Sequence, residues 1–118
     1  MIEHKIVERT ASQVDQVVYI TTTAGDADTR VLAPYEQVIE VNSALGTLGI
    51  YMPPVASAKG RFYSIIALTG ETKTVTVYDS TLAPSHDWPG DISLNADLDR
   101  VLLFSDGKRW WVISDMFT

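Results

Sequence analysis

The chain has 118 residues, of which 46% are hydrophobic and 20% charged, a balance typical of one globular domain rather than of a disordered chain. It has no cysteine, which excludes disulfides and thiolate metal sites, and its net charge of −6 disfavours binding to the phosphates of nucleic acids. No apolar run approaches the ~20 residues that span a bilayer, and the charged N-terminal segment does not fit a signal peptide, so we expect no membrane insertion.

Short runs rich in Val, Thr, Ile and aromatic residues recur along the chain, separated by Gly, Pro, Asn and Asp. This pattern is typical of β-strands in a sandwich, a barrel or a β-prism. Two segments, 11–18 and 33–38, have short stretches of helical spacing, but β-branched residues favour strand in the first and neither is long enough to change the fold class. We predict an all-β chain with strands over residues 3–9, 16–23, 36–42, 47–52, 61–69, 73–79, 91–95, 99–105 and 109–114.

Turn residues predict how neighbouring strands connect. The Asp-Gly pair at 106–107 is a strong hairpin signal between the last two strands, and residues 70–72 provide a second tight connection. Gly60 ends a turn of small residues and permits a backbone conformation that other residues avoid. We therefore expect a compact antiparallel β sandwich or barrel-like module.

Several predicted strands are apolar on both faces. Successive side chains of a strand point to opposite faces, so Trp110 and Trp111 cannot enter the same layer, and we expect whichever faces inward to pack in the core. In a small antiparallel protein one face of a sheet normally meets water and is polar. The second face is then covered by a second sheet, by the N-terminal residues or by a neighbouring subunit, and we favour a homo-oligomer.

The chain from about residue 32 carries motifs in a recognisable order. These are a strand at 36–43, a strand ending in Pro-Pro at 50–54, a small-residue turn ending in Lys-Gly at 55–60, a following strand, and a Ser-Asp-Gly hairpin at 105–107 closed by Trp-Trp-Val at 110–112. This order resembles the small β modules of tailed-bacteriophage virion proteins, found in tail fibres, head fibres and capsid decoration proteins. Met52 stands where the family has Leu, and the family's single tryptophan is doubled.

The resemblance implies a homotrimeric structural protein of the virion, assembled in the host cytoplasm. Because decoration proteins are short standalone chains, we favour a capsid decoration (cement) protein whose partners are its own copies and the major capsid protein or other virion proteins. Residues 1–31 do not match the family and are predicted to be an N-terminal arm or anchoring strands, with the β-module over 32–118. The side chains expected to contact other copies or partners are Ile6, Val17, Tyr19, Phe62, Tyr63, Trp110 and Trp111.

One loop could face a ligand. It contains His86, Asp87 and Trp88, and the His-Asp pair could resemble a base with its orienting acid. No nucleophile or oxyanion loop accompanies the pair, so we expect a solvated surface loop and no enzyme. The acids at 91, 97 and 99 could offer oxygen ligands to Ca²⁺ but lack the glycine and glutamate of a calcium loop, so no metal or cofactor is expected.

Two other functions fit the same residues. A tail-fibre or head-fibre protein would bind a receptor or a glycan on the host surface. A carbohydrate-binding module unrelated to virions would stack its tryptophans on sugars, although packing in a core or an interface is the commoner use of such side chains.

Overall fold

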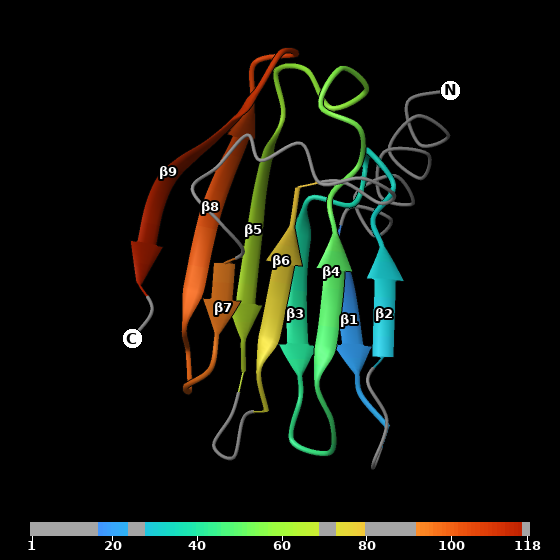
Figure 1. The fold of residues 1–118 in the computed structure, drawn as a ribbon, viewed down its shortest axis with the longest axis vertical. Coiled ribbons are helices and arrows are strands. Elements are labelled where there is room, and N and C mark those ends of the chain that lie inside the picture. The colour runs from blue at the N-terminus through green and yellow to red at the C-terminus, as the bar shows by residue number, and fades with distance from the viewer. Residues whose placement is uncertain (1–16, 24–27, 69–72, 80–91, 117–118) are drawn as a thin grey trace, which may run out of the picture.

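The structure is a computed structural model that describes residues 17–23, 28–68, 73–79 and 92–116. These residues form nine strands and no helix (Figure 1). The strands are β1 (Val17–Thr21), β2 (Asp28–Val31), β3 (Val38–Asn42), β4 (Leu48–Tyr51), β5 (Phe62–Ala67), β6 (Val75–Tyr78), β7 (Ile92–Leu94), β8 (Arg100–Ser105) and β9 (Trp110–Met116).

The strands make two sheets. Sheet A has the order β1-β3-β5-β8-β9, and sheet B has the order β2-β4-β6-β7. Figure 1 views the two sheets face-on, with strands of one lying over strands of the other. Alternate residues of each sheet are buried, among them Ile39 and Val41 of β3 and Ile50 of β4, and they join a single hydrophobic core. The predicted all-β sandwich is confirmed at this level.

The chain crosses from one sheet to the other after each of its first five strands, so successive strands of a sheet run in the same direction. β1, β3 and β5 pair in parallel, and so do β2, β4 and β6. The first six strands therefore form three turns of a two-layer β-solenoid, each turn with one strand in each sheet. Antiparallel pairing begins with β7 and continues through β8 and β9. The prediction of an antiparallel module is therefore wrong for the first six strands.

Only one of the two predicted hairpins forms. β8 and β9 pair around Asp106 and Gly107, as predicted. The carboxylate of Asp106 accepts the backbone N–H groups of Lys108 and Arg109 at 2.8 Å each, and Gly107 has φ +93°. β5 and β6 instead lie in different sheets, so the hairpin predicted around residues 70–72 is wrong.

The N-terminal residues that the structure describes belong to the sandwich. β1 and β2 are outermost strands of sheets A and B. Val18 and Ile20 of β1 pack against the core. β2 was not among the predicted strands. Residues 1–16, with the predicted strand at 3–9, lie outside the described residues, and a separate arm there stays a prediction.

A buried aromatic pair closes one end of the core. The ring of Tyr63 lies edge-on to Trp110, with 5.4 Å between centroids, and both side chains are almost fully buried. The Tyr63 hydroxyl donates a hydrogen bond of 2.6 Å to the carbonyl oxygen of Pro34. Burial raises the pKa of Tyr63 from 10.0 to about 12, so the hydroxyl keeps its proton to a higher pH than an ordinary tyrosine does. Pro34 lies in a turn rather than in the short helix considered for residues 33–38.

Candidate functional site

The outward side chains of sheet A form three rows across the strands, set by the pairing register. One row is aromatic, the middle row has a serine near its centre, and the third ends in Tyr19 and Met116. The rows are Phe62, Phe104 and Trp111; Val17, Val38, Ser64, Leu102 and Ser114; and Tyr19, Glu40, Ile66, Arg100 and Met116. We call these residues the outer face of sheet A.

This face carries an unusual share of exposed apolar side chains. Eleven large hydrophobic side chains are exposed in the described residues, and six of them lie on the outer face of sheet A: Val17, Tyr19, Val38, Phe62, Trp111 and Met116. Their exposed fractions run from 39% for Val38 to 60% for Tyr19. Single exposed apolar residues are normal on soluble proteins, but a contiguous group of them is typical of a surface that contacts another molecule.

The small side chain of Ser64 leaves a depression at the centre of the face. This side chain lies between larger neighbours and lines two hollows at once. One hollow is bounded by Val17, Val38 and Phe62, and the other by Arg100 and Met116. The two hollows are neighbours, since Leu102 as well as Ser64 lines both. The face therefore has relief into which side chains of a second surface can pack.

Backbone hydrogen bonds join the small-residue turn to the final hairpin at one end of the sandwich. The N–H of Gly60 donates to the carbonyl oxygen of Ser105 at 2.8 Å, and the Ser105 hydroxyl donates to the carbonyl oxygen of Val55 at 2.6 Å. Gly60 has φ +80°, a conformation that disfavours any residue with a Cβ. The structure thus places side by side two of the motifs that carry the sequence resemblance.

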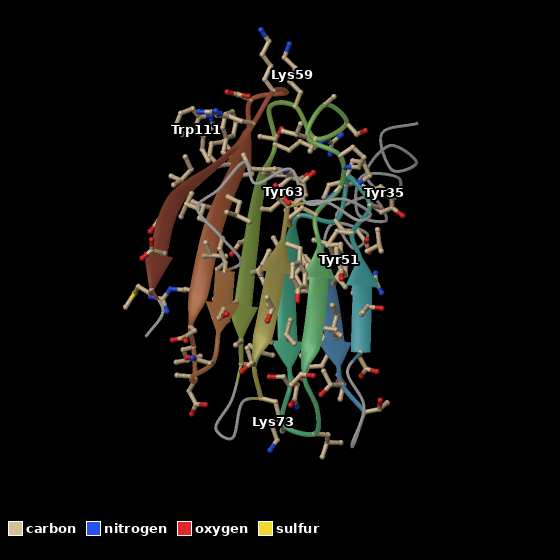
Figure 2. The ribbon with its side chains drawn as sticks, in the orientation of Figure 1. Tyr35, Tyr51, Lys59, Tyr63, Lys73 and Trp111 are labelled. Carbon is tan, nitrogen blue, oxygen red and sulfur yellow. The ribbon has the colours of Figure 1, made fainter. Side chains whose placement is uncertain are left out.

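Trp111 is held in place at this end by Asp106. Its indole Nε1–H donates to the Asp106 carboxylate at 2.9 Å, and the Arg109 guanidinium lies 5.6 Å from the centre of the indole ring. The hydrogen bond from Trp111, followed by those from the N–H groups of Arg109 and Lys108, lowers the pKa of Asp106 to about 2. Figure 2 shows Trp111 at the edge of the sandwich, near the end where Lys59 projects.

The residues predicted to contact other copies divide between surface and core. Val17, Tyr19, Phe62 and Trp111 come from three strands far apart in the sequence and lie together on the outer face of sheet A. Tyr63 and Trp110 do not lie on this face. The alternation of side chains along each strand turns both into the core, where 2% or less of each is exposed. The prediction that Tyr63 and Trp110 lie at an interface is therefore wrong. The prediction that the inward-facing tryptophan packs in the core is confirmed, and that tryptophan is Trp110. Ile6, His86, Asp87 and Trp88 lie outside the described residues.

Sequence reasoning missed several residues of this face. Val38, Ile66, Leu102 and Phe104 were not singled out, although they alternate with buried neighbours on their strands. For three of them the signal is the period of two that links Phe62 to Ile66 on β5 and Leu102 to Phe104 on β8.

Buried polar groups in the described residues have structural roles. Glu36 accepts hydrogen bonds from the Arg30 guanidinium and from the backbone N–H of Ala33. Asp99 accepts the N–H groups of Asn95 and Ala96 and so shapes the turn before β8. Among the residues that the structure describes, no three His, Asp or Glu side chains gather as a metal site requires, and no helix is long and apolar enough to cross a membrane.

The described residues thus combine an apolar face on one sheet with a hairpin at one end that carries an exposed indole. Strand register and backbone hydrogen bonds position the face and the hairpin, and the Asp106 carboxylate positions the indole of Trp111. Comparison of the sequence with known protein families and with curated proteins finds no match.

Proposed function

We propose that this chain is a structural protein of a tailed-bacteriophage virion, a capsid decoration protein that binds and stabilises the head shell as a homotrimer. It acts by binding and not by catalysis. The observation that supports assembly is the outer face of sheet A with its six exposed large apolar side chains. The virion assignment is supported by the sequence motifs at 50–60 and 105–112.

Burial of the apolar face would contribute free energy that favours self-association. Fully burying one large apolar side chain contributes about 1.5–3 kcal/mol, so completing the burial of six half-exposed ones contributes roughly 5–9 kcal/mol per copy. Association itself costs about 4–15 kcal/mol. Self-association through this face is therefore concentration-dependent, and copies held near one another on a shell would associate more readily than copies in dilute solution.

The edge of sheet A offers a second kind of contact. In the described residues β1 has a strand partner on one side only, β3. An extended segment of another protein can add to such an edge through backbone hydrogen bonds, which do not depend on side-chain charge. This suits a chain whose net charge of −6 would otherwise repel its own copies.

The experiment is co-sedimentation with undecorated shells of the parent phage. We expect the full chain to pellet with the shells and Val38→Lys, which places a charge on the outer face of sheet A, to stay largely in solution. Val31→Lys is the matched control, because Val31 is also exposed but lies in β2 of sheet B. Equal binding by both variants would show that this face is not used, and failure of the wild-type chain to bind shells would contradict the decoration role.

The N-terminal arm is tested by a shorter chain that starts at residue 17. The cut must spare β1, because Val18 and Ile20 pack against the core and a deletion of residues 1–24 would remove them. If residues 1–16, with Ile2, Ile6 and Val7, anchor the protein, the shorter chain keeps its β circular-dichroism spectrum but no longer pellets with shells. Undiminished shell binding would show that the arm is not the anchor.

A fibre or carbohydrate-binding role is the second candidate. It is favoured by an aromatic pair on the outer face of sheet B, where Tyr51 and Tyr78 stack with 4.7 Å between ring centroids. The Tyr78 ring lies over Gly49, where an added Cβ would come within 3.3 Å of it. Glycan-array binding that is lost in Tyr51→Ala, without any binding to shells, would replace the decoration proposal with this one.

A further inference from the structure

One end of this acidic molecule is basic. The turn at 53–61 and the hairpin at 105–110, which backbone hydrogen bonds hold together, carry four of the nine Lys and Arg residues of the chain. Asp106 is the one acidic residue in these two segments. The local net charge is thus +3 on a chain whose total is −6. We call this end the basic tip; its cations are Lys59, Arg61, Lys108 and Arg109.

The backbone of the tip is shaped so that the stem of Lys59 lies against the hairpin that carries Lys108 and Arg109. A Cβ added to Gly107 would lie 2.8 Å from Cδ and 2.9 Å from Cγ of Lys59, so the bare glycine lets the Lys59 stem cross the hairpin. Gly60 and Gly107 both have positive φ. Lys59, Lys108 and Arg109 are all exposed, and Figure 2 shows Lys59 pointing away from the body of the molecule.

The single carboxylate of the tip is engaged within the hairpin. Asp106 accepts two backbone N–H groups and the indole N–H of Trp111. The tip also adjoins the aromatic row of sheet A, in which Phe62 and Phe104 pack with 4.6 Å between ring centroids. Cations and exposed aromatic rings therefore lie side by side on one continuous surface.

We infer that the basic tip binds an acidic segment of a partner protein. Asp or Glu carboxylates would pair with Lys59, Lys108 and the planar guanidinium of Arg109, which can hold a carboxylate with two hydrogen bonds. Arg is one of the residue types that most often dominate protein–protein interfaces, which favours a protein over a nucleic acid or a sulfated glycan.

Charge also fixes the direction of approach. Outside the tip the described residues carry seven acidic and three basic side chains, so an acidic partner is repelled there and drawn to the tip. This inference does not rest on the virion assignment, because the tip would bind acidic segments whatever the protein that carries them.

The test uses the full chain and a fluorescent glutamate-rich peptide, measured by anisotropy at low ionic strength. We expect saturable binding that weakens as salt is added. Lys59→Gln should weaken it by roughly two- to five-fold, the usual size of one exposed ion pair. Lys73→Gln is the matched control, since it removes the same charge from an exposed lysine at the opposite end of the molecule (Figure 2), and it should leave the affinity unchanged.

Three results would overturn the inference. The first is no peptide binding at low salt, and the second is equal weakening by Lys59→Gln and Lys73→Gln, which would indicate only the overall charge of the chain. The third is tighter binding of a heparin fragment or an oligonucleotide of matched charge than of the peptide. Shell co-sedimentation is measured separately, so failure of the decoration proposal and failure of this inference are distinguishable.

Discussion

Two glycines and one carboxylate define the end of the sandwich where the hairpin meets the small-residue turn. Gly60 and Gly107 adopt positive φ, and Asp106 organises the hairpin backbone and the Trp111 ring. The two glycines differ physically. No atom lies within 4 Å of a Cβ added at Gly60, whereas at Gly107 the Lys59 side chain already occupies that space. The first is required by backbone conformation alone.

Replacing Gly60 tests that requirement. Gly60→Val should lower the free energy of unfolding by about 1–3 kcal/mol, because a β-branched residue is strained at φ +80° even where space is open. Ala56→Val is the control, since Ala56 is exposed in the same turn and does not have positive φ. Urea unfolding measures both variants, and equal stability of the two would show that the backbone at Gly60 relaxes freely.

The Asp106 carboxylate gives a second test at this scale. Because the Trp111 indole N–H is the largest cause of its lowered pKa, Trp111→Phe should raise the pKa of Asp106 from about 2 towards its ordinary value of 3.8. Carboxyl NMR titration follows this directly. An unchanged titration would mean that the backbone N–H groups of Lys108 and Arg109 hold the carboxylate without help from the ring.

The sign of the pH effect follows from the direction of that shift. A carboxyl whose folded pKa is lowered contributes stability that is fully present above its unfolded pKa, near 3.8, and is lost as the pH falls through about 2. Asp106→Asn should therefore be less stable than the wild type at neutral pH, and the difference should shrink over this acidic window. A difference that persists below pH 2 would contradict the account.

At the scale of elements, β3 shows how alternation assigns each side chain to a layer. Ile39 is fully buried, whereas its neighbour Val38 is 39% exposed on the outer face of sheet A. Ile39→Ala should cost about 2–5 kcal/mol of unfolding free energy. In dilute solution Val38→Ala should cost less than about 1 kcal/mol. Similar losses for the two would mean that the faces of β3 are assigned wrongly.

Residue type predicted eight of the nine described strands, because most of them are rich in β-branched and aromatic residues. β2 was missed because it reads Asp-Thr-Arg-Val, a polar run without an alternating apolar face. It is nevertheless a strand, since it pairs in parallel with β4 along its whole length. Tertiary pairing overrides weak local propensity at such an edge.

Strand pairing was less predictable than strand position. A turn signal shows where the chain reverses but not which sheet the next strand joins, and the segment after β5 leads into sheet B instead of back along sheet A. The apolar residues on both faces of β5 were interpreted as a sign of oligomerisation within an antiparallel fold. Parallel strands also read as continuous apolar runs, but only where both faces are covered, and here Phe62 on the outer face of β5 is 49% exposed.

At the scale of the whole molecule, the described surface separates into parts of different chemistry. One sheet face is apolar, one end is basic, and the chain as a whole carries −6. From the sequence, alternation could establish that Trp110 and Trp111 diverge, but not which of them is outside. Which tryptophan lies outside depends on which side of its strand faces the other sheet, and the sequence does not state this. For the same reason Tyr63 was predicted to lie at an interface.

The central claim is that the outer face of sheet A is covered by other copies of the chain. Light scattering on the eluting protein at high micromolar concentration tests it most directly. The account predicts three times the 13.0 kDa monomer mass for the wild type and for the sheet B control Val31→Lys, and the monomer mass for Val38→Lys. A wild-type chain that stays at 13.0 kDa, or a Val38→Lys variant that still assembles, would contradict it.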